Sequence, residues 1–270
     1  MTENTGPRVD LISAPDNPYK SLYLAYRVCY SDKEPYEILE EIDENKITYE
    51  DMFKFVERMF KTGHGSPLEQ VYFEFTISGV SRAFSHQFVR HRVGINFEQQ
   101  SQRYVKMVSF MEKNFFDYVI PKTIGTSRKA TETYFGIMEK IADAYQTLID
   151  EGMPPEDARF VLPNATTTNF KITINLRELL HIGDLRLCTR AQWEFRRVVA
   201  LMRAEIHKQY PLLASIIQPK CGEHRMGTCD ETLKDYKACP ISVSRPHKSM
   251  IEKSWAKSLN EDDFITILNS

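Results

Sequence analysis

Two short stretches in which apolar and polar residues alternate constrain the fold most. The first covers residues 71–77, and the pattern returns over residues 169–174. A period of two places the apolar side chains on one face, which predicts two half-buried strands. Apolar stripes with helical spacing predict helices over residues 51–60 and 131–149. Because strands and helices follow no repeating strand–helix–strand order, we expect an α+β domain with a mixed sheet and flanking helices.

Capping residues predict where two further helices begin. Ser81 is a suitable N-cap for a helix that runs to about Arg90, after a turn over residues 78–81. The two prolines at residues 154–155, followed by two acidic residues, predict a short helix toward Val161. Proline suits the first turn of a helix, and acidic side chains favour its positive end.

Two later helices are predicted from paired polar residues three positions apart. Asn175 with Glu178 resembles a capping box, and Thr189 with Gln192 repeats the signal. We expect the second of these helices to end near Pro211. The rest of the chain has no clear periodicity, so the sequence alone assigns it no element.

Composition limits the classes of function. The chain has 270 residues, of which 42% are hydrophobic and 27% charged, enough for one large domain. With a net charge of −2, the protein as a whole does not attract nucleic acid or an anionic membrane electrostatically, so neither is expected as a partner. No apolar run reaches the roughly 20 residues of a membrane span. With no signal peptide evident at the first residues, we expect a cytoplasmic protein.

The cysteine pattern does not predict a metal site. Five cysteines are few for a disulfide framework and fit a reducing compartment. Cys221, Cys229 and Cys239 cluster late, with His224 between them. Their spacings of eight and ten residues fit no compact zinc pattern, so loop cysteines are favoured and no bound metal is expected. Cys188 is interpreted as a buried structural thiol and not as a nucleophile.

A dense cluster of charged residues covers residues 90–104. Fifteen residues contain three arginines, one histidine, one glutamate and one serine. Three guanidiniums this close repel one another unless an anion neutralises them, and arginine binds phosphate bidentately. A phosphate site is one interpretation. A solvated surface cluster, or loose binding of nucleic acid, is the alternative that spacing alone leaves open.

The same cluster resembles the signature of a known family. Arg90-His91-Arg92, eight residues, and then Ser101-x-Arg103 is similar to the motif of the flavin-dependent thymidylate synthases. Further segments in family order resemble it at residues 63–69, 87–89, 158–163, 175–186 and 191–194. Together these segments make the resemblance specific over about residues 60–210.

The resemblance implies an activity and an organisation. It implies a methyltransferase that uses FAD in the reductive methylation of dUMP to dTMP, in de novo dTMP biosynthesis. 5,10-Methylenetetrahydrofolate would donate the carbon and NADPH would be the reductant. The implied assembly is a homotetramer with shared active sites. Residues 1–215 would form the catalytic domain, with residues 216–270 as a C-terminal extension packed on it. The implied fold is not a Rossmann fold, and the chain lacks Gly-x-Gly-x-x-Gly.

The resemblance also implies roles for individual residues. The residues expected to bind FAD are His64, Ser66, Arg90, His91, Arg92, Glu98, Asn175, Arg177 and His181. The residues expected to bind dUMP are Gln87, Arg90, Glu98, Gln99, Gln100, Ser101, Gln102, Arg103, Arg159 and Arg186. The catalytic residues would be His64 and Arg186, with Arg186 beside the base, where it favours ionisation at uracil N3.

One departure and one alternative concern the loop expected over residues 98–103. Two residues, Gln99 and Gln100, separate Glu98 from Ser101, where many family members have one. Glu98 is preferred over Gln99 as the family glutamate because its residue type agrees. Ser101 is favoured as a phosphate ligand over a nucleophile, because the guanidiniums around His91 would lower the basicity of that histidine.

Two other classes of function fit the sequence less well. A nucleotide enzyme without flavin, such as a phosphotransferase, would carry a P-loop, and the sequence has none. A nucleic-acid-binding module built on residues 90–103 would need a basic domain, which a net charge of −2 disfavours.

Overall fold

The computed structural model describes residues 6–107 and 116–241. Its centre is an antiparallel sheet in the order β1-β2-β4-β3. The strands are β1 (Arg8–Ser13), β2 (Tyr72–Ser81), β3 (Ile95–Gln99) and β4 (Thr167–Asn175). The α-helices are α1 (Pro18–Tyr30), α2 (Pro35–Asp43), α3 (Tyr49–Met59), α4 (Arg82–Phe88), α5 (Arg128–Asp150), α6 (Pro155–Ala158), α7 (Leu176–Arg186), α8 (Trp193–His207), α9 (Pro211–Ser215) and α10 (Leu233–Ala238). Short 3₁₀ helices are η1 (Ser66–Gln70), η2 (Ile124–Thr126) and η3 (Arg159–Val161).

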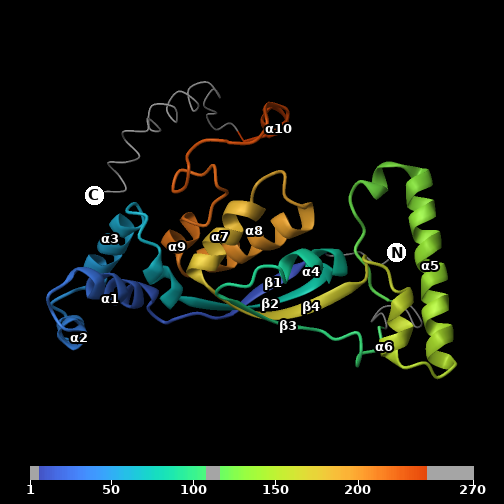
Figure 1. The fold of residues 1–270 in the computed structure, drawn as a ribbon, viewed down its shortest axis with the longest axis horizontal. Coiled ribbons are helices and arrows are strands. Elements are labelled where there is room, and N and C mark those ends of the chain that lie inside the picture. The colour runs from blue at the N-terminus through green and yellow to red at the C-terminus, as the bar shows by residue number, and fades with distance from the viewer. Residues whose placement is uncertain (1–5, 108–115, 242–270) are drawn as a thin grey trace, which may run out of the picture.

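The helices surround the sheet unevenly. Figure 1 shows α7 and α8 along one face, α1 to α3 gathered at one end of the sheet, and α5 standing at the opposite end. The α+β class with flanking helices is confirmed. The described strands pair in antiparallel fashion throughout, so the sheet is not mixed as the sequence analysis expected.

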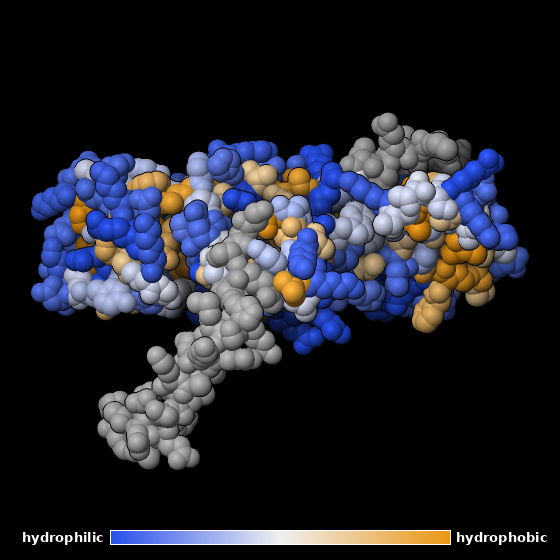
Figure 2. Space-filling model, turned by 90° about the horizontal axis from the view of Figure 1, so that it is seen from above, coloured by the Kyte–Doolittle hydropathy of each residue, from blue (hydrophilic) through white to orange (hydrophobic). Residues whose placement is uncertain are grey.

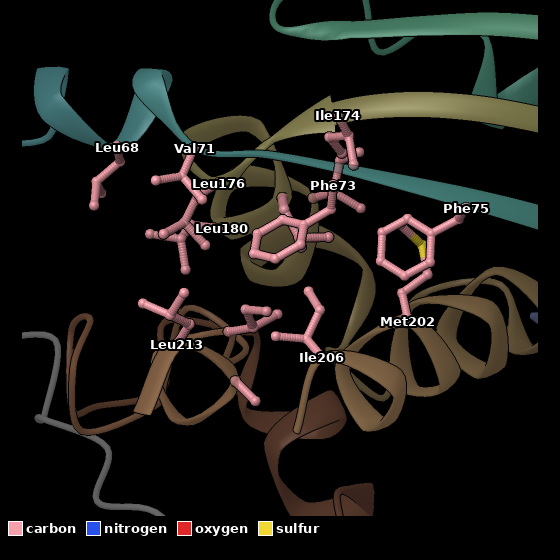
Figure 3. Close-up of a cluster of buried hydrophobic side chains, with 14 of the residues drawn as sticks. Leu68, Val71, Phe73, Phe75, Ile174, Leu176, Leu180, Met202, Ile206 and Leu213 are labelled. Atoms are coloured by element: carbon pink, nitrogen blue, oxygen red, sulfur yellow. The ribbon is translucent and has the colours of Figure 1, made fainter. Parts of the chain in front are cut away.

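The two strands predicted from alternation form the middle of the sheet. Phe73 lies opposite Ile174 in the register of β2 and β4, and both side chains are fully buried. Figure 3 shows this apolar face against Met202 and Ile206 of α8 and Leu213 of α9. Each such buried side chain contributes about 1.5–3 kcal/mol through removal from water. The sheet–helix layer therefore forms the main core.

The helices predicted over residues 51–60 and 131–149 are confirmed as α3 and α5. The predicted turn over residues 78–81 is wrong, because β2 continues to Ser81. A register shift between Ile77 and Val80 accommodates extra backbone there, and Gly79 has φ +70°. Glycine adopts that conformation without a steric penalty, so a glycine near a strand end marked a β-bulge and not a turn.

Two predicted helix boundaries need correction. Ser81 is confirmed as an N-cap and accepts a hydrogen bond from Phe84 N at 3.0 Å, but α4 ends at Phe88 instead of near Arg90. Arg90 lies in the turn that follows. The predicted start at Thr189 is wrong, because Gln192 caps α8 by accepting from Phe195 N.

The α8 helix ends at His207, and Pro211 opens the separate helix α9. The short helix expected toward Val161 is confirmed as α6 followed by η3. β1, β3, α1 and α2 were not predicted from the sequence.

A second, smaller core lies under α5. It consists of Met107, Phe116, Met138, Tyr145, Ala142 and Ala158. The boundary expected between residues 215 and 216 stays a prediction, although Ile216 and Ile217 are buried in the main core. The first residues after that boundary therefore pack as part of the domain. Among the described residues, no helix has both the length and the apolar character needed to cross a membrane.

Candidate functional site

A buried histidine–carboxylate pair lies at the start of α7. Asn175 caps this helix, with its side-chain oxygen accepting from Glu178 N at 2.8 Å. The predicted capping box is only half correct, because the Glu178 carboxylate does not return to the cap. It lies 3.1 Å from His91 Nδ1, and both side chains are less than 10% exposed. Glu178 therefore fixes the orientation of the His91 ring.

Arg186 lies on the other side of the same histidine. Its Nε is 3.4 Å from His91 Nε2, and its guanidinium carbon is 4.6 Å from the centre of the Phe195 ring. None of the ion pairs among the described residues includes Arg186. Burial lowers the pKa of Arg186, but a guanidinium stays protonated. A partly desolvated cation without an acidic partner is a suitable site for a ligand that carries or develops negative charge.

His181 lies three residues after Glu178 on α7, close to the histidine–carboxylate pair. Ligand atoms of His91, Glu178 and His181 all lie within 4.8 Å of one another. Two imidazoles and a carboxylate can in principle chelate a metal ion. In this structure His91 and Glu178 already satisfy each other by a hydrogen bond.

The segment with the predicted residues His64 and Ser66 approaches α1. The Ser66 hydroxyl lies 2.9 Å from His64 Nε2, and the Tyr30 hydroxyl lies 3.0 Å from His64 Nδ1. Tyr26 also donates to the His64 carbonyl at 3.1 Å. A cavity of about 70 Å³ beside His64 is lined by Leu180 among others. Both ring nitrogens are engaged, so the imidazole is held in one orientation. The sequence analysis missed the two tyrosines.

Asn175 and Arg177, two residues predicted to bind FAD, lie at the N-terminal end of α7. They contact two other segments there, η1 and the turn at Gly94. Arg177 forms an ion pair with Glu69 of η1, which is the glutamate of the 63–69 motif. Asn175 N donates to the Gly94 carbonyl at 2.8 Å. Three motif segments that are distant in sequence therefore meet at the start of α7.

A second candidate centre is a cavity of about 290 Å³. Its lining is Arg82, His86, Gln102, Arg159, Phe160, Leu162, Pro163 and Asn164. Burial lowers the pKa of Arg82, and the positive charge of Arg159 lowers it further. Gln102 Nε2 is buried and has no hydrogen-bond partner among the described residues. Two facing guanidiniums and an unsatisfied amide donor fit a phosphate or a nucleotide.

Arg159 and Gln102 were predicted as dUMP ligands, whereas Arg82 was missed. The sequence signal was present, since Arg82 follows the cap Ser81 at the first position of α4. Because Ser81 was interpreted only as a helix cap, Arg82 beside it was not considered as a ligand-binding residue.

The segment over residues 98–103 is not wholly a loop, which corrects the sequence analysis. Glu98 and Gln99 belong to β3, where Glu98 is exposed opposite Lys171. Gln99 donates from Nε2 to the Thr168 hydroxyl at 3.1 Å. Gln100 Oε1 accepts from Asn169 at 2.9 Å. Pairing with β4 thus holds this part of the motif.

Ser101 and Arg103 are engaged locally. The Ser101 hydroxyl accepts from Arg103 N at 3.1 Å, and no histidine is hydrogen-bonded to it among the described residues. A nucleophilic serine needs such a base. Arg103 Nε lies 3.1 Å from Glu156, and the guanidinium stacks on Tyr104. The expected phosphate contacts of Ser101 and Arg103 stay predictions.

Arg90 and Arg92 are exposed, and neither forms an ion pair with a described residue. Gln87 is half-buried on α4. Two uncompensated guanidiniums have the donor chemistry that a pyrophosphate requires. The hydroxyl groups of Tyr30 and Ser66 and the His64 ring add further polar groups. Together with the two arginines, these groups fit the binding of FAD, and no glycine-rich turn is needed.

The fold and these two centres define an α+β protein built to bind anionic, nucleotide-like ligands. The family described as "Thymidylate synthase complementing protein" matches residues 10–212. A flavin-dependent thymidylate synthase of Geobacter sulfurreducens is 38% identical over 224 residues, covering 83% of this chain and 91% of the relative. One of Nitratidesulfovibrio vulgaris is 37% identical, covering 84% and 92%.

The fold is similar to the crystal structure of the UMP/dUMP methylase PolB from Streptomyces cacaoi bound with 5-Br dUMP. The TM-score is 0.63 at 20% identity, and the match covers 78% of this chain and 93% of that one. The chain belongs to the flavin-dependent thymidylate synthase family.

Proposed function

We propose that the protein catalyses the reductive methylation of dUMP to dTMP with FAD as its cofactor. 5,10-Methylenetetrahydrofolate and NADPH are the proposed co-substrates, and the cytoplasm is the proposed location. Family membership supports the reaction class. The observation that carries the proposal is the cavity between Arg82 and Arg159, where an unsatisfied Gln102 amide faces two cations.

In this proposal the chain's own residues bind and polarise the nucleotide. Arg82 and Arg159 hold the phosphate by charge-assisted hydrogen bonds, and the Gln102 amide donates to a nucleotide oxygen. Arg186 does not line this cavity. In the shared active site of the proposed homotetramer it would act from another subunit and stabilise negative charge that grows on the uracil as C5 becomes nucleophilic. The bound flavin supplies the hydride. Arg90 and Arg92 neutralise the flavin's pyrophosphate.

We also propose the homotetramer that the resemblance implies. Figure 2 shows apolar surface at the end of the molecule where α5 stands in Figure 1. Exposed apolar side chains of α5, the α6–η3 segment and the turn between them include Ile137, Met153, Val161 and Phe160, which is 83% exposed. Such side chains favour contact with another subunit. Because Phe160 also lines the nucleotide cavity, a neighbouring copy here would complete the wall of that cavity.

The first prediction tests the reaction. Purified protein should show the visible absorption of an oxidised flavin, as isolated or after addition of FAD. With dUMP, methylenetetrahydrofolate and NADPH, it should form dTMP, and omitting either co-substrate should stop the reaction. UMP in place of dUMP is the control for nucleotide choice. Correctly folded protein that binds no flavin, or forms no dTMP once loaded, contradicts the proposed function.

The second prediction concerns the phosphate. Arg159→Ala and Arg82→Ala should each weaken dUMP binding by roughly one to two decades, since a charge-assisted contact contributes about 1.5–3 kcal/mol. Binding of deoxyuridine, which has no phosphate, should change much less. Calorimetric titration of both ligands measures the difference, and Arg128→Ala, at an exposed surface pair, is the matched control. Equal weakening of both ligands would show that the two arginines do not meet the phosphate.

A further inference from the structure

Four of the five cysteines converge on one small cavity. Cys188 follows α7, Cys221 and Cys229 lie between α9 and α10, and Cys239 follows α10 directly. All four line an enclosed space of about 20 Å³, and all are free thiols. In Figure 1 this is the region where the chain between α9 and α10 passes beside α7 and α8. The fold thus brings together four cysteines that are up to 51 positions apart in the sequence.

Both hydrogen-bond donors and acceptors surround these thiols, and Cys188 Sγ lies 3.9 Å from Glu231 Oε1. Cys239 Sγ accepts from the Ile241 N–H and from the Thr189 hydroxyl, each at 3.4 Å. Donors to sulfur stabilise its deprotonated form. Four neighbouring thiolates require a cation.

We propose that Cys188, Cys221, Cys229 and Cys239 bind a structural Zn²⁺ ion. Tetrahedral coordination by four thiolates is a common structural zinc site, and soft sulfur ligands select zinc over magnesium or calcium. A cavity of about 20 Å³ holds little more than one water-sized species, which fits a single ion and not an iron–sulfur cluster.

Binding requires the cavity to contract. Among the described residues, no three of these sulfurs lie within 4.8 Å of one another. Zinc–sulfur bonds of about 2.3 Å draw the ligands closer than that. Three of the four thiols lie on the segment after α9, which contributes no strand to the sheet. His224 lines a different cavity, beside His64, and is not a ligand in this proposal.

Ion pairs also join the segments around the cavity. Arg190 pairs with Glu231 at 2.7 Å, and Lys220 pairs with Asp230 at 2.7 Å. These ion pairs connect the segments that form the wall of the cavity, which Arg190, Glu231 and Asp235 line. The ion would fasten residues 221–239 to the segment that directly follows Arg186, so it would stabilise the C-terminal part of the domain. The spacings of Cys221, Cys229 and Cys239 did not predict this site, because its fourth ligand, Cys188, is distant in sequence.

Metal analysis of the whole purified chain tests the proposal. Protein from zinc-supplemented medium should contain about one zinc ion per chain, the content of a single tetrathiolate site. Cys221→Ser and Cys229→Ser should lose it and unfold at lower temperature. Cys29→Ser is the matched control, since Cys29 is the exposed fifth cysteine, and it should keep the ion.

A second measurement does not depend on the variants folding. A thiol-specific mercurial should release zinc from the wild-type protein, and Co²⁺ exchanged into it should give a thiolate-to-cobalt charge-transfer band. Protein without zinc that also fails to take up Zn²⁺ overturns the proposal. So does zinc retained by both serine variants, which would place the ion elsewhere, for example at His91, Glu178 and His181. Iron with acid-labile sulfide, or a disulfide between two of the four cysteines, overturns it as well.

Discussion

Replacing Arg186 with lysine is expected to slow dTMP formation by roughly one to two decades although the charge is kept. The guanidinium lies between the His91 ring and the face of Phe195, without an acidic partner among the described residues. A planar fork can direct two donors at the edge of a uracil, whereas an ammonium is a point charge. Loss of one charge-assisted contact that strengthens in the transition state costs about 1.5–3 kcal/mol.

Single-turnover kinetics distinguish this role from a structural one. With enzyme that has been reduced beforehand, Arg186→Lys should lower the rate of dTMP formation, while flavin reduction by NADPH changes little. Arg128→Lys, at an exposed ion pair with Glu132, is the control and should leave both rates unchanged. A wild-type rate of dTMP formation in Arg186→Lys would show that this arginine only packs on Phe195.

The central part of the fold was predictable because its pattern is local. Phe73 and Ile174 belong to strands whose buried faces alternate cleanly with polar residues, and such strands lie inside the sheet. The edge strands gave no such signal. In β1 and β3 apolar and polar residues alternate over only a few positions, which is too short a pattern to identify a strand, and only Val9 and Ile95 are buried there. β3 also lies within the arginine-rich motif, which was interpreted as ligand-binding loop.

The sequence indicated many residues of the candidate site, but it did not indicate which of these side chains contact one another. The motif identified His91, but its partner Glu178 lies 87 positions away and was assigned to helix capping. Arg82 was missed for a similar reason, since its role depends on facing Arg159 across a cavity. Spacing along a chain indicates which side chains share a helix face. It does not indicate which ones the sheet and its helices bring together, because that depends on long-range packing.

Gly94→Ala is expected to cause the largest loss of stability among the substitutions proposed. Gly94 has φ +71°, and a Cβ built there would clash with Asn175 Nδ2 and lie 2.7 Å from its Cγ and Oδ1. Asn175 is buried, caps α7 through Glu178 N, and is a proposed FAD ligand. Alanine at this φ costs about 1–2 kcal/mol, and displacing the cap costs about 1 kcal/mol more. Flavin affinity should fall with stability, because both depend on the Asn175 side chain.

Gly152→Ala separates the two contributions. Gly152 has φ +84°, but a Cβ there would meet nothing within 4 Å, so this variant has the backbone penalty without the clash. Denaturant unfolding at one fixed protein concentration should therefore rank Gly94→Ala well below Gly152→Ala, and only Gly94→Ala should bind FAD more weakly. If the two variants lose equal stability and both bind FAD normally, Asn175 gives way to the new methyl group at no cost. The close approach of Gly94 to the start of α7 would then have no part in shaping the flavin site.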